Sequence, residues 1–387
     1  MARHYGLDWL RIAAFALLIL YHALLVFVGW GFHVELPGSK WLAVPMLALN
    51  PWRLSLLFVV SGYASRALLG RAGGAGAFAR ERTARLVPPL LFGVLLVVPP
   101  QPWVELAAKH GYPHGFLRFW LGDYFGFAAL DGVVLPTWNH LWFVGYLWIY
   151  TLALAAAAAV SPAPGRAALA RLFDRWFAGP AVLAAPIAWM IVVNLLLFPG
   201  ARETHALVDD WVAHATYLPV FLFGFALGGA PRVLAWLGRR WRVSAAIAVA
   251  GYAVVAALQI RHLHFVGWPE PWGSAFSVAR AVQGWAAVAA LVGAADRFWN
   301  RDAPGRALLT EAVFPFYLVH QTVIVLVAWR LMPMGLPWPA SLAIVVAATV
   351  AGCWAFYLAG RAIGPLRPLI GLRRRARSVA PLVPAAA

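Results

Sequence analysis

Long apolar runs constrain this chain more than any other feature. Ten mainly apolar segments are close to the 17–25 residues that a helix needs to cross a bilayer core. Because 63% of the residues are hydrophobic and only 12% are charged, a soluble domain is a poor match. We predict an all-α, polytopic integral membrane protein with about ten transmembrane helices, at residues 7–29, 46–69, 85–100, 139–160, 181–199, 214–230, 243–260, 274–294, 308–331 and 339–360.

The basic residues fall in alternate loops between these segments. Arginines gather in 66–85, 166–175, 232–242, 297–306 and 361–377, whereas most acidic residues lie in the other loops. Because cytoplasmic loops of membrane proteins are enriched in Lys and Arg, this alternation places both termini in the cytoplasm. It also accounts for the net charge of +17 without nucleic acid as a partner, since the basic residues are not clustered on a soluble domain.

The chain divides into one membrane domain and a short tail. We predict a transmembrane domain over 1–372 and a basic, then Ala/Pro-rich, disordered cytoplasmic tail over 373–387. The longest non-cytoplasmic loop, about 100–138, has room for interfacial helices. The glycine-rich stretch at 71–76 lacks the Gly-Lys-Ser/Thr of a phosphate loop and is interpreted as a linker.

The first apolar segment carries three ionisable side chains, Asp8, Arg11 and His22. Eleven residues make almost three helical turns, so Arg11 and His22 share one face, about 16 Å apart along the axis. Ionisable groups inside a membrane are costly and usually functional. A neutral imidazole in such a site can accept a proton from a hydroxyl. A buried histidine that only bonds a neighbouring helix is the alternative.

Two further motifs lie in the next two segments, the first near mid-membrane depth and the second just inside the membrane at the cytoplasmic side. Ser61 and Tyr63 flank a glycine in an apolar run, where close helix packing is the simpler explanation. Arg82 and Arg85 lie three residues apart at the start of a helix, with Arg66 nearby. Guanidinium groups suit phosphates by their forked geometry, although ordinary anchoring at the membrane surface also explains them.

Two histidines and a glutamate complete the candidate residues. His140 opens the fourth segment from the outside, and Glu311 and His320 lie on the ninth. These residues suggest a pathway lined from both sides of the membrane. No paired His, Cys or carboxylate spacing indicates a metal site, so none is expected. The histidines in loops, His33 and His205 among them, are expected to be solvated.

The ordered set of motifs resembles the membrane acyltransferase-3 family. It comprises Leu7-Asp-Trp-Leu-Arg11 followed by His22, the Ser-Gly-Tyr of 61–63, Arg82-x-x-Arg85 with Pro88, and Tyr317-Leu-Val-His320. The layout of ten helices with both ends inside agrees with that family. Residues 29–34, 59–63 and 140–143 look like the branch that includes glucans biosynthesis protein C, which is associated with succinylation of periplasmic glucans.

The resemblance implies a multi-pass enzyme of the bacterial inner membrane. It would transfer an acyl group, acetyl or succinyl, from cytoplasmic acyl-coenzyme A to a hydroxyl of an extracytoplasmic carbohydrate such as a periplasmic glucan. Arg82 and Arg85 would meet the coenzyme phosphates, helped by Arg66. His22 would be the base or a transient acyl carrier. Arg11 and Asp8 would position it or line the donor path, and His140 and His320 would bind the acceptor or relay protons.

A different class of protein also buries His, Arg and Asp in a membrane. A secondary transporter, or a flippase for a sugar or lipid-linked sugar, is the alternative interpretation. Such proteins often contain inverted repeats and broken helices, and no repeat is visible in this sequence. Cleavage of a thioester by the purified protein distinguishes the two classes. The sequence identifies neither the acyl group, the acceptor nor the oligomeric state.

Overall fold

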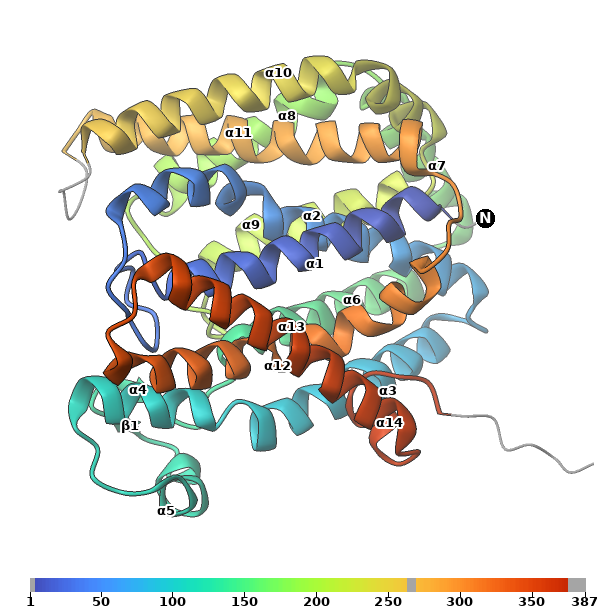
Figure 1. Cartoon of the computed structure of the whole chain (residues 1–387). Helices are drawn as coiled ribbons and strands as arrows, with labels where there is room; N and C mark the ends of the chain where they lie inside the picture. Colours follow the sequence, from blue (N-terminus) through green and yellow to red (C-terminus); the bar gives the residue numbers. More distant parts are fainter. Residues whose placement is uncertain (1–3, 263–268, 375–387) are drawn as a thin grey trace, which may run out of the picture.

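The computed structural model describes residues 4–262 and 269–374 as a bundle of long helices (Figure 1). Each of the ten predicted segments contains a helix. These helices are α1 (Tyr5–Leu25), α2 (Ala43–Arg71), α3 (Ala75–Phe92), α6 (Trp142–Val160), α8 (Ala181–Val192), α9 (Trp211–Leu227), α10 (Pro231–Arg261), α11 (Trp272–Ala294), α12 (Arg306–Leu331) and α13 (Trp338–Ala362).

The helices have the length and hydropathy of a multi-pass membrane protein. In the described ranges, eight helical spans have at least 18 residues and a mean hydropathy high enough to cross a membrane. Helix α8 together with the helix before it would make a ninth. The remaining predicted segment, α9, is apolar but shorter. The third segment begins ten residues earlier than predicted, at Ala75, and it also ends later, because α3 continues through the π-helical η2 (Gly93–Val97) into α4 (Pro100–His110).

The start of α1 and the end of α13 lie at the same end of the bundle (Figure 1). We call this the terminal end, and the opposite one the loop end. The loop end carries α4, α5 (Phe116–Leu121) and the antiparallel pair β1 (Ala129–Leu130) and β2 (Val133–Val134) (Figure 1). The helices expected in the 100–138 loop are therefore present. Short helical turns complete the chain: η1 (Lys40–Leu42), η3 (Asp123–Phe125), η4 (Asn139–Leu141), η5 (Val193–Leu197), η6 (Ala295–Trp299), η7 (Met332–Met334) and α14 (Leu366–Leu369).

One basic loop of the prediction is a helix instead. Residues predicted as a loop form α7 (Ala163–Trp176), which meets α8 at a bend of 99°. Its Leu169, Leu172 and Trp176 are exposed, while its arginines lie among them in the sequence. A helix with exposed apolar and basic residues is typical of one that lies along a membrane surface. The disordered tail predicted over 373–387 falls, apart from its first two residues, outside the described residues.

Two glycines bring α2 and α9 into close contact. A Cβ atom on Gly62 would lie 2.0 Å from the carbonyl oxygen of Phe221, and one on Gly224 would lie 2.1 Å from that of Val59. Small residues at helix interfaces allow this close approach in membranes, where apolar burial gives no driving force between helices. The glycine beside Ser61 therefore has a packing role, as the simpler explanation of that motif required.

We predict that Gly62→Ala destabilises the bundle. The new methyl group would overlap the α9 backbone, and overpacking of this kind costs about 1–3 kcal/mol. Thermal unfolding of the detergent-purified protein measures the effect. Gly70→Ala on the same helix is the control, because nothing lies within 4 Å of its added Cβ. Equal midpoints for the two variants would contradict this packing.

We also predict that the two ends of the bundle face opposite sides of the membrane. Gly73 and Gly115 are exposed, at the terminal end and the loop end respectively. The chain's own thiol, Cys353, is buried. Cysteine introduced at either position should therefore react with an impermeant maleimide from one side only, and the two positions from opposite sides. Labelling of both from the same side would refute this arrangement.

Candidate active site

A polar cavity of about 840 Å³ reaches the surface at the loop end of the bundle. Its inner wall includes His22 of α1, His140 of η4 and Tyr317 of α12. Exposed residues of two loops, Gly31 and Arg202, line its mouth. The volume suits a small-molecule substrate, and three candidate residues predicted from distant parts of the sequence meet here: His22, His140 and His320.

The centre of the site is a hydrogen bond between His22 and His320. Their Nδ1 and Nε2 atoms are 2.7 Å apart, and the ring planes differ by only 12°. His320 is completely buried, whereas His22 is partly exposed and lines the cavity. The pair therefore joins a hidden imidazole to one that a substrate can reach.

The surroundings of His320 determine which nitrogen of His22 is free. Nδ1 of His320 is 2.7 Å from the carbonyl oxygen of Tyr317. A carbonyl only accepts, so this nitrogen carries the proton, and Nε2 of neutral His320 must accept. Nδ1 of His22 therefore donates to it. In neutral His22 this leaves Nε2 as an unprotonated nitrogen, which is the form that a general base or a nucleophile needs.

His140 and Tyr317 pack against His320 and are hydrogen-bonded to each other's helical segments. His140 Nε2 donates to the carbonyl oxygens of Tyr317 and Leu318, at 3.1 and 3.2 Å. The Tyr317 hydroxyl donates in return to the carbonyl of His140. The rings of His140 and His320 meet edge to face, with centroids 5.0 Å apart. His140 is thus held against α12 beside the pair, with its ring at the cavity wall.

Helices α1 and α12 lie side by side and in parallel, and this explains the polar stripe on α1. Asp8 pairs with Arg306 at 2.9 Å, Arg11 reaches the Thr310 carbonyl at 3.4 Å, and His22 binds His320. The numbering offset between partners is 298 or 299 each time. The stripe predicted to face the protein interior does so, and α12 is its partner.

The same geometry separates the members of the stripe. Asp8 and Arg11 lie near the terminal end, and His22 lies in the last turn of α1 at the loop end. Between them Phe15 packs on Tyr317, with ring centroids 5.4 Å apart. Asp8 binds Arg306 rather than His22, so the structure does not bring these predicted partners together.

The other predicted binding residues also lie towards the terminal end. Arg82 and Arg85 are in the middle of α3, where Arg82 is buried and its Nε has no hydrogen-bond partner among the described residues. The Arg66 guanidinium lies 5.2 Å from the Phe225 ring centre. Two more predicted binding residues do not line the cavity. Glu311 binds Arg361 and the Tyr357 hydroxyl, and Tyr63 contacts the ring of His4.

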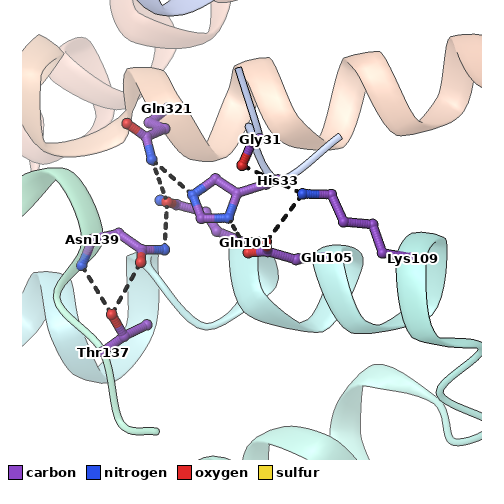
Figure 2. A network of polar contacts seen from close by, with 8 residues as sticks. All are labelled: Gly31, His33, Gln101, Glu105, Lys109, Thr137, Asn139 and Gln321. Atoms are coloured by element: carbon purple, nitrogen blue, oxygen red, sulfur yellow. Dashed lines mark hydrogen bonds and ion pairs between the residues drawn. The ribbon is translucent and has the colours of Figure 1, made fainter. Parts of the chain in front are cut away.

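A polar network spans the loop end beside the cavity (Figure 2). His33 Nδ1 is 2.6 Å from Glu105, and its Nε2 is 3.1 Å from the amide nitrogen of Gln321. Gln101 accepts from Gln321 at 3.0 Å and from Asn139 at 2.9 Å. His33, Asn139 and Gln321 also line the cavity. The expectation that His33 is merely solvated is wrong.

His205 is likewise not a free loop histidine. Its ring stacks on Trp142, with centroids 4.1 Å apart and planes 10° apart, and both residues line the cavity. The neighbouring Glu203 accepts from the Tyr217 hydroxyl at 3.0 Å. Amide, carboxylate and aromatic side chains therefore surround the mouth, which is the mixture that suits a polar ligand with apolar faces.

Sequence reasoning missed several of these residues, although a signal was present for two. Arg53 and Arg280 line the cavity, and each is a charged side chain within a predicted transmembrane segment. The rule that flagged Arg11 applies equally to them. No comparable signal marks Gln101 or Glu105, because both lie in a stretch interpreted as a loop. In the described part of the chain no group of His, Cys, Asp or Glu has the arrangement to hold a metal ion.

Comparison with known proteins defines the class. A family model described as an acyltransferase domain matches residues 4–358, nearly the whole chain. The protein belongs to this family, acyltransferase-3, and is a membrane acyltransferase that moves groups other than amino-acyl groups. No curated protein and no solved structure matches the chain. Because the matched family is one of acyltransferases, the transporter interpretation is set aside.

Proposed function

We propose that this enzyme transfers an acyl group from acyl-coenzyme A, bound at the terminal end, to a hydroxyl of a carbohydrate bound in the cavity. The observation that carries the proposal is the His22–His320 pair, which leaves one unprotonated imidazole nitrogen beside a cavity of substrate size. Acyl transfer to a hydroxyl needs a group that removes the hydroxyl proton or carries the acyl group.

His22 has the geometry for either role. As the acceptor oxygen attacks the thioester carbonyl, Nε2 of His22 takes its proton, and the thiolate of coenzyme A leaves and receives that proton from the imidazolium. The imidazolium that forms on His22 is stabilised because Nδ1–H already donates to His320, whose own Nδ1–H donates to the Tyr317 carbonyl. A histidine oriented by a second hydrogen-bonded group is the arrangement of the serine-protease triad. If His22 carries the acyl group instead, the same nitrogen is the nucleophile.

The loop end supplies suitable groups for a carbohydrate. Sugars are bound by amides and carboxylates that take their hydroxyls and by aromatic rings that cover their apolar faces. Asn139, Gln321 and Glu203 offer the first kind of group at the cavity, and Trp142 offers the second. These residues, together with His140, support an acceptor site at this end.

The terminal end supplies suitable groups for the donor. Arg82 and Arg85 are two guanidinium groups one helical turn apart, and Arg66 adds a third positive charge at the same end. Phosphates are bound well by such forks. From Arg11 to His22 the axial rise is about 16 Å, so an extended arm would pass along α1 to reach the histidine. Phe15 and Tyr317 now fill that route and would have to move apart.

Membrane orientation and chemical identity complete the proposal. The basic loops place the terminal end in the cytoplasm of a bacterial cell, where acyl-coenzyme A is made, and the cavity outside the inner membrane. The acyl group is acetyl or succinyl, and a periplasmic glucan is the acceptor suggested by residues 29–34, 59–63 and 140–143. Ser61 and Tyr63 lie on the α2 stretch between the donor end and the cavity. Glu311 is paired with Arg361 and lies at the donor end, away from the acceptor cavity.

We predict that His22→Gln abolishes measurable transfer while coenzyme binding persists. Glutamine keeps a hydrogen-bonding side chain without the basicity, and loss of a general base costs about 10²–10⁴ in rate. Release of free coenzyme A by the purified enzyme measures turnover. His320→Gln should lower kcat by less, with little change in KM, because it acts through His22. Exposed His110→Gln on α4 is the control. Near-normal turnover of His22→Gln would show that His22 only packs.

We further predict that Arg82→Ala with Arg85→Ala weakens acyl-coenzyme A binding. Each charge-assisted hydrogen bond contributes about 1.5–3 kcal/mol, so the double variant should lose a few kcal/mol. Calorimetric titration with a non-hydrolysable thioether analogue measures the affinity. Arg171→Ala, on exposed α7 at the same end, removes a charge without touching α3. Affinity unchanged in the double variant would place the phosphates elsewhere.

A further inference from the structure

Two arginines in the cavity wall have no role in the scheme above. Arg53 comes from α2 and Arg280 from α11, and both line the same cavity as His22. Neither forms an ion pair with a carboxylate in the described part of the chain. Charged groups inside a membrane protein are usually paired with an opposite charge, so two unpaired cations together call for an explanation.

Arg53 is buried with most of its donors unused. The side chain is 5% exposed, and neither Nε nor one terminal nitrogen, Nη1, has a hydrogen-bond partner in the described structure. Its guanidinium carbon lies over the Tyr21 ring, 3.6 Å from the ring centre. A cation–π contact compensates for part of the burial but satisfies no N–H group. Buried unsatisfied donors on a charged group are strongly unfavourable unless a ligand uses them.

Arg280 is brought beside Arg53 by helix packing. Gly284, one turn further along α11, lets that helix approach α2, since its Cβ would lie 3.0 Å from the Pro51 carbonyl. Arg280 then donates to Asn50 at 2.5 Å, and Asn50 donates to the Tyr21 hydroxyl at 2.6 Å. Tyr21 and Asn50 thus connect the two guanidinium groups without neutralising either.

The cavity as a whole is positively charged. Its charged lining residues are Arg53, Arg280, Arg202 at the mouth, and a single carboxylate, Glu203. Glu203 is engaged with the Tyr217 hydroxyl and with His205 at 3.3 Å. Three guanidinium groups thus share one carboxylate, and the wall carries net positive charge.

We propose that Arg53 and Arg280 form a subsite for a carboxylate that a substrate brings into the cavity. The forked donors of two guanidinium groups match the two oxygens of a carboxylate. The Tyr21 ring, over which Arg53 lies, is 6.1 Å from the His22 ring, and Arg53 and His22 line the same cavity, so the subsite adjoins the transfer histidine. The assignment of a role in transfer rests on the proposed function, whereas the anion site itself does not.

The site can be tested without catalysis. Free succinate is the probe, and its uncharged diamide, succinamide, is the matched control. A ligand that binds only the folded state raises the unfolding midpoint. Succinate should stabilise the purified wild type and the exposed-surface variant Arg330→Met, but not Arg53→Met or Arg280→Met. No stabilisation of the wild type, or equal stabilisation of Arg53→Met, overturns the proposal even if thioester cleavage is normal.

Turnover then identifies which substrate carries the carboxylate. We expect wild type to favour succinyl-coenzyme A over 4-methylpentanoyl-coenzyme A, which has the same shape without the charge. The preference in kcat/KM should fall about 10- to 100-fold in Arg53→Met and Arg280→Met, the factor for one charge-assisted hydrogen bond. In these variants kcat/KM for the uncharged donor should change far less than kcat/KM for succinyl-coenzyme A.

The acceptor is the other possible source of the carboxylate. A preference for an oligosaccharide bearing uronate over its neutral counterpart, lost in the same variants, would assign the carboxylate to the acceptor and still support the site. Absence of both preferences in wild type overturns it. Failure of every thioester to be cleaved would refute the proposed function instead, and the succinate measurement would stand by itself.

Discussion

The hydrogen bond between His22 and His320 is the interaction on which the site depends. It joins α1 and α12, two helices from opposite ends of the sequence, beside the polar cavity. Because a backbone carbonyl fixes the proton on His320, the direction of the whole chain of hydrogen bonds is set. One nitrogen of His22 is left for chemistry without any further ionisable residue being needed.

The parallel pairing of α1 and α12 gives the molecule two different polar ends. The Asp8–Arg306 ion pair joins the two helices at the terminal end, and the His22–His320 hydrogen bond joins them at the loop end. Aromatic rings pack between these two contacts. A cavity with amides, aromatic rings and buried arginines opens at the histidine end, and basic residues gather at the opposite end. This separation suits an enzyme whose two substrates lie on different sides of a membrane.

The sequence predicted the fold class because hydropathy and loop charge are strong, local signals. All ten apolar segments are helical, and the prolines at 88, 89, 186, 219 and 315 lie inside helices as expected for membrane segments. Helix α7 was missed because its apolar residues face outward between arginines, which resembles a basic loop. The starting point of α3 was misplaced for the same reason, since its first turns are charged.

Some residues of the candidate site could be predicted from the sequence and others could not, for physical reasons. Intramembrane charge identified His22 and His320, and the family motifs agreed, but periodicity on one helix cannot tell which other helix lies opposite. Asp8 shares the stripe of His22 and yet binds Arg306 at the far end. His33 and Gln101 belong to the network only because loops fold back over the bundle, and loop paths carry no periodic signal.

The tautomer of His22 shows directly whether His320 orients its imidazole. Nitrogen NMR of histidine-labelled protein in lipid nanodiscs distinguishes the protonated from the unprotonated ring nitrogen. Neutral His22 should carry its proton on Nδ1 in the wild type and should lose this preference in His320→Ala. A proton on Nε2 in the wild type, or a tautomer unaffected by removal of His320, would show that His320 does not direct His22.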